Sequence, residues 1–447
     1  MGSEGNSSPF VVEKSEVVLV KPAKPTPDVS LSLSVIDNDP QIEGIVQTIC
    51  VFTPEPQQAR HDLASLLQYA LSHALVYYYP LAGKLHRKSD DNRLQLNYKA
   101  GDGVPFTKAT STSTLSSINY LDSAGDGAYQ LVPCYVPVKG CEGYDPLALQ
   151  VTKFACGGIT IGMAHSHSVS DGVGAAQFFR AMIELASGKT QRPSVIPVWD
   201  RERLPFNGKL GDVVGSPMAG SFISLTGDMT REILNITSDD ITNLKKTIAE
   251  NEQFTNETEK KVVVTTFEIL AAHVWRARCR ALNMSPDETA ILDIVIDIRS
   301  FMDPPLPVGY YGNGCVSGNV VLTAKELREA SLAHVVRLIK DMKKAALDKQ
   351  FVLGKLTEIE RRVKDMESFK GISRGFMTLT DWRQIGLQYD GWGGLKNIIP
   401  FIPMAMPFIS VLLPASKADP AISGGVRLLV ALPKDAMTKF KEEMNAI

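Results

Sequence analysis

The stretch AHSHSVSDGVG, residues 164–174, decides how we interpret the rest of the chain. Residues 158–164 lead into it and alternate between larger apolar side chains and small or polar ones, a period of two that predicts a β-strand. Residues 175–187 follow it with apolar side chains at near-helical spacing, and Gly188 predicts the end of that helix. We therefore expect His167 where a strand ends and a helix begins, a position that is exposed yet held by rigid elements on both sides.

Three interpretations of this stretch compete. In the first, His165 and His167 are hydrogen-bonded residues at a strand end, and Asp171 caps the following helix. In the second, the two histidines and Asp171 bind a metal ion, although the nearest further histidines, His86 and His273, have no ligand spacing. In the third, His167 is a general base, because an imidazole accepts a proton from an alcohol or amine near neutral pH, and Asp171 supports its loop.

Length and composition narrow the class of protein. A chain of 447 residues favours two domains, and a net charge of -2 provides no basic field for nucleic acid. No apolar run reaches the roughly 18–20 residues that a membrane span needs, and residues 1–9 contain no apolar signal core. Six cysteines without a secretion signal favour free thiols in a reducing cytosol. We therefore expect a cytoplasmic chain that binds neither nucleic acid nor membrane.

Periodicity predicts strands and helices in both halves of the chain, separated by a long segment without either. Residues 188–217 are rich in Pro, Gly and basic residues and have no clear period, as in a linker or a functional loop. Edge strands are expected within residues 10–55, and strands and loops within 83–132. Helices are expected at 58–78, 237–252, 325–348 and 435–444, a strand turning into a helix at 262–282, and strands at 147–164, 291–298, 377–381, 406–413 and 426–432.

The order of motifs along the chain decides among the three interpretations. With its His-x-x-x-Asp-Gly motif at 167–172, the sequence resembles the BAHD family of plant acyl-CoA-dependent acyltransferases, and the likeness runs through almost the whole chain. The matching segments are YPLAGKL at 79–85, GVPF at 103–106, PVW at 197–199, TFEILAAHVWR at 266–276, DIR at 297–299 and GYYGN at 309–313.

This resemblance implies an α/β fold of two chloramphenicol-acetyltransferase-like domains, each with a mixed β-sheet flanked by helices. Residues 1–190 would form the domain that carries His-x-x-x-Asp, residues 191–217 the crossover loop, and residues 218–447 the second domain. A solvent channel between the domains reaches the catalytic histidine from both faces in the family. The protein is expected to act as a monomer.

The resemblance also implies the reaction and the roles of several residues. His167 would be the general base for direct attack of a substrate hydroxyl on acyl-CoA in a ternary complex, with acyl-CoA as co-substrate and no metal or tightly bound cofactor. Asp171 would turn away from the pocket and form a structural pair with Arg299. Thr380 and Trp392 are candidate oxyanion donors, although Trp392 also fits a packing role.

The acceptor and the donor are predicted from the branch of the family. Residues 151–158, 199–202 and 305–313 resemble the branch of taxane acetyltransferases and benzyl alcohol benzoyltransferases, which favours acetyl or benzoyl transfer to a hydroxyl of a specialised metabolite such as a terpenoid. One alternative is hydroxycinnamoyl transfer to an alcohol or a polyamine. The basic residues of the crossover and Lys260-Lys261 either meet the 3′-phosphate of CoA or are solvated.

A second alternative is a non-catalytic relative that binds a metabolite. It is suggested by Tyr389-Asp390-Gly391-Trp392-Gly393, which departs from the Asp-Phe-Gly-Trp-Gly pattern of the family. Either two residues have been substituted in place, or a Phe has been deleted after Asp390. The family motif is chiefly structural, so the departure bears on local loop geometry more than on the base.

Overall fold

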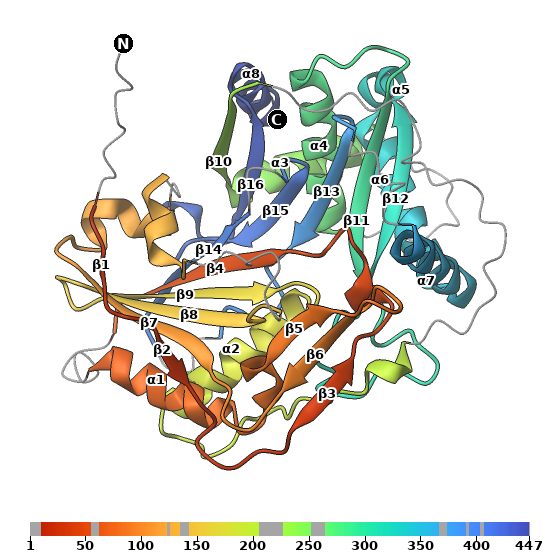
Figure 1. Cartoon of the computed structure of the whole chain (residues 1–447). Helices are drawn as coiled ribbons and strands as arrows, with labels where there is room; N and C mark the ends of the chain where they lie inside the picture. The colour runs from red at the N-terminus through yellow and green to blue at the C-terminus, as the bar shows by residue number, and fades with distance from the viewer. Residues whose placement is uncertain are drawn as a thin grey trace, which may run out of the picture.

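The protein is built on two large mixed β-sheets and one small sheet (Figure 1). The computed structural model describes residues 10–54, 62–122, 126–134, 143–204, 227–251, 264–365, 373–389, 393–402 and 406–446. The α/β architecture with mixed sheets confirms the fold class expected from the sequence. Among the described residues, none of the helices combines the length and the apolar character that crossing a membrane requires.

The first large sheet carries the strand that leads to His167. Two helices, α1 (Leu63–Ala74) and α2 (Gly172–Ala186), share one apolar core with it, and a small sheet of β3 (Val29–Ser32), β6 (Leu94–Tyr98) and β5 (Lys84–Arg87) lies beside it. Among the described strands of this sheet, only β7 and β8 pair in parallel. The strand order is β1 (Glu13–Lys14), β7 (Val104–Ser111), β8 (Leu147–Phe154), β9 (Ile159–Ser166), β4 (Ile45–Phe52) and β14 (Leu395–Phe401), with β2 (Val18–Val20) also on β7.

The second large sheet comes from the second half of the chain. Parallel pairs join β11 to β13 and β13 to β15, and the other pairs are antiparallel. Its strand order is β10 (Met229–Ile236), β16 (Val426–Pro433), β15 (Ile409–Pro414), β13 (Phe376–Asp381), β11 (Thr289–Asp297) and β12 (Cys315–Thr323). The helices of this half are α3 (Ser238–Asn251), α4 (Thr266–Ala281), α5 (Ala324–Glu329), α6 (Leu332–Ala345), α7 (Lys349–Lys364) and α8 (Lys434–Asn445).

One strand of the second half completes the sheet of the first. The sequence predicted no strand between those expected at 377–381 and 406–413, but β14 forms there and pairs antiparallel with β4. A lone strand whose partner lies some 350 residues away in the sequence gives no local hairpin signal, which is why that prediction was wrong. Residues 205–217 of the predicted crossover loop, with its boundary at residue 217, lie outside the described residues.

Helix ends differ from the expected ones where capping residues decide them. The helix expected at 58–78 is α1, which begins after its N-cap Asp62 and ends at Ala74. The single helix expected at 325–348 is two, because the Ser331 side chain accepts a hydrogen bond from the His334 N–H and starts α6. The sequence analysis missed α7 altogether, although Asp348 caps it in the same way.

Candidate active site

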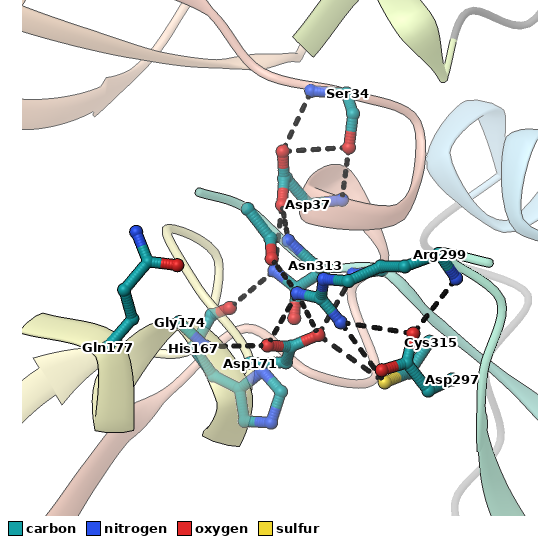
Figure 2. Close-up of polar contacts among 12 residues, drawn as sticks. Ser34, Asp37, His167, Asp171, Gly174, Gln177, Asp297, Arg299, Asn313 and Cys315 are labelled. Atoms are coloured by element: carbon teal, nitrogen blue, oxygen red, sulfur yellow. Dashed lines mark hydrogen bonds and ion pairs between the residues drawn. The ribbon is translucent and has the colours of Figure 1, made fainter. Parts of the chain in front are cut away.

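His167 follows the last residue of β9 and is held by its backbone on two sides. Its N–H donates to the carbonyl of Gly44 at 2.8 Å, and its carbonyl accepts from Asn313 Nδ2 at 2.7 Å (Figure 2). The imidazole is half-buried: Nδ1 is enclosed without a hydrogen-bond partner among the described residues, which leaves Nε2 as the accessible nitrogen. The local structure therefore presents one ring nitrogen outward from a fixed strand end.

Asp171 caps α2 and faces Arg299 rather than the imidazole. Its carboxylate accepts from the Gly174 N–H at 3.0 Å and the Gly314 N–H at 2.9 Å, and Arg299 Nη2 lies 2.8 Å from Oδ2 (Figure 2). Burial alone would raise the pKa of this carboxyl, but the Arg299 charge and the two backbone donors lower it below its usual value. Asp171 is thus an ionised anchor that joins the two halves of the chain.

Arg299 fills a tight space at the start of the loop after β11. Its Nη2 also donates to the Gly312 carbonyl at 2.9 Å, and its Nη1 donates to Asp297 Oδ1 at 3.3 Å. A Cβ on Gly314 would lie 2.7 Å from the guanidinium carbon, so only glycine fits there. Although burial opposes its charge, Asp171 raises the pKa of Arg299, which keeps the pair ionised.

A second buried ion pair, which the sequence analysis did not find, holds the same loop. Asp37, in the short helix at Ile36–Asn38, accepts from Arg201 Nη1 and from both the backbone N–H and Nδ2 of Asn313, at 2.9 and 2.7 Å. Arg201 Nη2 also donates to the Val169 carbonyl at 2.8 Å. Through Asn313 and Arg201, Asp37 therefore fixes the backbone at residues 167 and 169.

The position of Arg201 corrects one expectation. As a basic residue of the crossover it was expected to meet a CoA phosphate or to be solvated, but it is only 2% exposed and paired with Asp37. No local sequence pattern reveals that an arginine is buried when its partner lies so far away in the sequence. The Lys260-Lys261 pair lies outside the described residues.

Two further histidines, His165 and His273, are buried packing residues. His165 lies beside a cavity of about 10 Å³, lined also by Met163, Val169 and Phe178, and holds an Nδ1 without a partner among the described residues. Burial, and then the neighbouring His167, lower its pKa to about 3, so His165 is neutral. His273 Nε2 donates a hydrogen bond to the Met444 carbonyl at 3.2 Å. The described residues contain no group of three side chains placed to bind a metal.

The remaining predicted site residues are less well connected to His167. Thr380 lies half-buried near the end of β13, and no hydrogen bond joins it to His167. Trp392, with Asp390 and Gly391, lies outside the described residues. The ring of Tyr389, the first residue of the altered motif, lies against α2, with its centroid 4.5 Å from the guanidinium carbon of Arg180.

Comparisons with known proteins agree with this fold. The family model described as the Transferase family matches residues 10–447. Vinorine synthase, whose crystal structure is known, superposes with a TM-score of 0.70 at 19% sequence identity over 96% of both chains. At that identity, the likeness establishes the fold alone.

Curated relatives extend the match to whole enzymes. Spermidine coumaroyl-CoA acyltransferase of Arabidopsis thaliana is 43% identical, over 98% of this chain and 95% of the relative. Spermidine sinapoyl-CoA acyltransferase of the same plant is 40% identical, over 99% of both chains. Taxadien-5-alpha-ol O-acetyltransferase of Taxus chinensis is 30% identical, over 98% of this chain and 97% of the relative.

The fold and the family match define the protein as an acyltransferase that uses acyl-CoA as co-substrate. The chain belongs to the BAHD family, as its motifs indicated, and the reaction class is acyl transfer from CoA to an alcohol or an amine.

Proposed function

We propose that this protein transfers a hydroxycinnamoyl group from CoA to an amine of a polyamine, with His167 as the general base. The observation that carries the choice of substrates is the identity of 43% and 40% to two spermidine acyltransferases over nearly the whole chain, against 30% to the taxadienol acetyltransferase. Of the acceptor classes weighed in the sequence analysis, this favours the polyamine.

His167 Nε2 is the accessible nitrogen and accepts a proton from the attacking amine. The amine nitrogen forms a bond to the thioester carbonyl carbon, the tetrahedral intermediate expels the CoA thiolate, and the imidazolium returns the proton to the sulfur. No acyl-enzyme is needed, because the thioester is already activated. Asp171 carries no proton in this scheme, since its carboxylate is paired with Arg299.

The oxyanion of the intermediate needs a hydrogen-bond donor about 3 Å away. We assign this role to the Thr380 hydroxyl, with the Trp392 ring N–H as a second candidate. We also propose that residues 1–190 and 218–447 form two acyltransferase domains joined through residues 191–217. The protein is proposed to act in the cytoplasm as a monomer, and size-exclusion chromatography checks its oligomeric state.

A second candidate is acetyl or benzoyl transfer to a hydroxyl, which the 30% identity to the taxadienol O-acetyltransferase favours. Release of CoA thiol, with mass spectrometry of the product, separates the two. The purified chain is offered coumaroyl-, sinapoyl-, benzoyl- and acetyl-CoA, each with spermidine or with a terpenoid alcohol. We expect the highest kcat/KM for a hydroxycinnamoyl donor with spermidine. Turnover only with an alcohol would overturn the polyamine assignment.

A further inference from the structure

One face of the second sheet is turned away from the helices α4 and α6. Along β11, Leu292 and Ile294 point into the core shared with α4 and α6. Asp293 and Val295 alternate with them and therefore belong to the opposite face. On this face Val295 and, on the neighbouring strand β12, Val321 are 40% and 43% exposed, so part of the face is open to solvent.

Asp293 is a buried carboxylate on this face with no cation as a hydrogen-bonding partner among the described residues. It is 5% exposed, and its Oδ2 accepts from Thr378 Oγ1 at 3.0 Å and Ser317 Oγ at 3.3 Å. Burial raises its pKa to about 6. A carboxylate that has lost its water and gained only hydroxyl donors is poorly compensated when ionised.

A buried oxygen without a donor among the described residues lies next to it. In the ladder of the sheet, Asp293 is opposite Asn319 on β12 and opposite Thr378 on β13. The Oδ1 atom of Asn319 is buried and accepts no hydrogen bond from the described residues. Two neighbouring strands therefore present acceptors, from Asp293 and Asn319, to a donor that the described part of the chain does not supply.

The charges on the nearby helix α7 do not neutralise Asp293. Lys355 and Arg362 both act on Asp293 and favour its ionised form, but each is already paired. Lys355 lies 3.1 Å from Glu358, and Arg362 lies 2.8 Å from Glu358 and 2.6 Å from Asp39. Two cations and three carboxylates leave the cluster with a net charge of about -1 once Asp293 ionises.

The strand that carries Asp293 also leads to the active site. At its far end Asp297 is opposite Cys315, whose thiol lies 3.3 Å from the Asp171 carboxylate. Asp293 is four residues back along β11, or about 13 Å at roughly 3.3 Å per residue. Thr380, the assigned oxyanion donor, lies two residues along β13 from Thr378, on the same face. Asp293 and Asn319 are therefore set back along the sheet from the reacting centre.

We infer that Asp293 and Asn319 bind a protonated amine of the acceptor, at one end of a polyamine whose other end is acylated at His167. This inference rests on the proposed function and specifies how the same site selects its acceptor. A protonated primary amine offers three N–H donors, which suits the carboxylate and the amide oxygen together. The positive charge of the amine is also opposite in sign to the net negative charge of the cluster around Asp293.

The test uses spermidine and a series of unbranched diamines of increasing length, with coumaroyl-CoA as donor. In the wild type, KM for the diamine should fall sharply at the length where the second amine reaches Asp293. Asp293→Asn should raise KM for spermidine about tenfold or more and remove the length dependence, while KM for coumaroyl-CoA stays the same. Asp287→Asn, the same change at an exposed site on the same half, is the matched control and should leave all these values unchanged.

The outcomes separate this inference from the proposed function. If the wild type does not acylate any polyamine, the proposed function fails. If it does, but Asp293→Asn leaves both KM and the length dependence unchanged, the amine site is overturned and the proposed function stands. Asn319→Leu is the second variant: it should raise the same KM, and gives the answer even if Asp293→Asn does not fold.

Discussion

Arg299 and Asp171 form an ion pair of 2.8 Å between the loop after β11 and the first turn of α2. The two elements belong to different halves of the chain, and Asp171 lies four residues after His167 in the sequence. Each partner also satisfies backbone groups, Gly174 and Gly314 for Asp171 and Gly312 for Arg299. The pair thus couples the orientation of the catalytic loop to the docking of the second half.

Breaking this pair should destabilise the protein and lower its activity together. Because both side chains are largely buried, Asp171→Ala or Arg299→Ala should each cost about 3–5 kcal/mol of unfolding free energy, since an unpaired charge remains. The double variant should be no worse than the worse single one. Chemical denaturation and thiol-release assays of the four proteins in the cycle give both quantities.

An exposed ion pair is the control for that cycle. Lys88 and Asp91 lie 2.9 Å apart at the surface, and their alanine variants should leave stability nearly unchanged, because water screens an exposed pair. Additive losses for Asp171→Ala and Arg299→Ala would contradict the pairing as the source of the effect.

Asn313 should affect turnover more than substrate binding. Its Nδ2 donates to both Asp37 and the His167 carbonyl, so Asn313→Asp replaces this donor with a carboxylate that faces two acceptors. A misplacement of about 1 Å costs roughly 10²-fold in rate, so kcat should fall on this order while KM for acyl-CoA changes little. Asn243→Ala, on the exposed face of α3, is the control. A change in KM alone would show that Asn313 does not position the base.

Asp293 should make the protein less stable as the pH rises. Its folded pKa, about 6, lies above its ordinary value of 3.8, so the native state holds the proton more tightly than the unfolded state does. Its contribution to stability is therefore lost between about pH 4 and pH 6, and Asp293→Asn should gain up to roughly 3 kcal/mol at pH 8 and almost nothing below pH 4. Urea unfolding at both pH values, with Asp287→Asn as reference, measures this; a variant less stable than the wild type at pH 8 would contradict it.

Tyr389 should stabilise the altered motif through its ring rather than its hydroxyl. Because Arg180 lies over the ring, Tyr389→Phe should be nearly neutral, and Tyr389→Ala should cost about 1 kcal/mol.

Tyr389→Asp combined with Asp390→Phe tests substitution in the family pattern, and insertion of a Phe after Asp390 tests deletion. If the two residues were substituted in place, the double variant should preserve the melting temperature; if a Phe was deleted, the insertion variant should. In either case KM for acyl-CoA should change more than KM for the acceptor. A shift in acceptor KM alone would place the loop on the acceptor side.

The sequence was informative wherever a local pattern or a motif carried the signal. The alternation before His167 predicted β9, and Asp171 followed by an apolar helical period predicted α2 and its cap. The pairing of Asp171 with Arg299 came from the family motifs, since no local pattern links residues 128 positions apart.

Long-range partners explain what the sequence did not reveal. Asp37, Arg201 and Asn313 meet from three distant segments, and the pairing of β14 with β4 depends on the docking of the two halves. In the sequence, Asp293 is one polar residue within an apolar strand. Only the register with Thr378 and Asn319 shows that it faces polar neighbours, on the side of the sheet turned away from α4 and α6.

Replacement of His167 by alanine tests the central claim most directly. With coumaroyl-CoA and spermidine, kcat of His167→Ala should fall by about 10²- to 10⁴-fold, because the general base is lost. The melting temperature and the affinity for CoA should remain those of the wild type. His73→Ala, a histidine on α1 whose ring stacks on Tyr69, controls for the loss of an imidazole and should keep full activity. A folded His167→Ala protein that retains more than about a tenth of the wild-type kcat would contradict the assignment of His167 as the base.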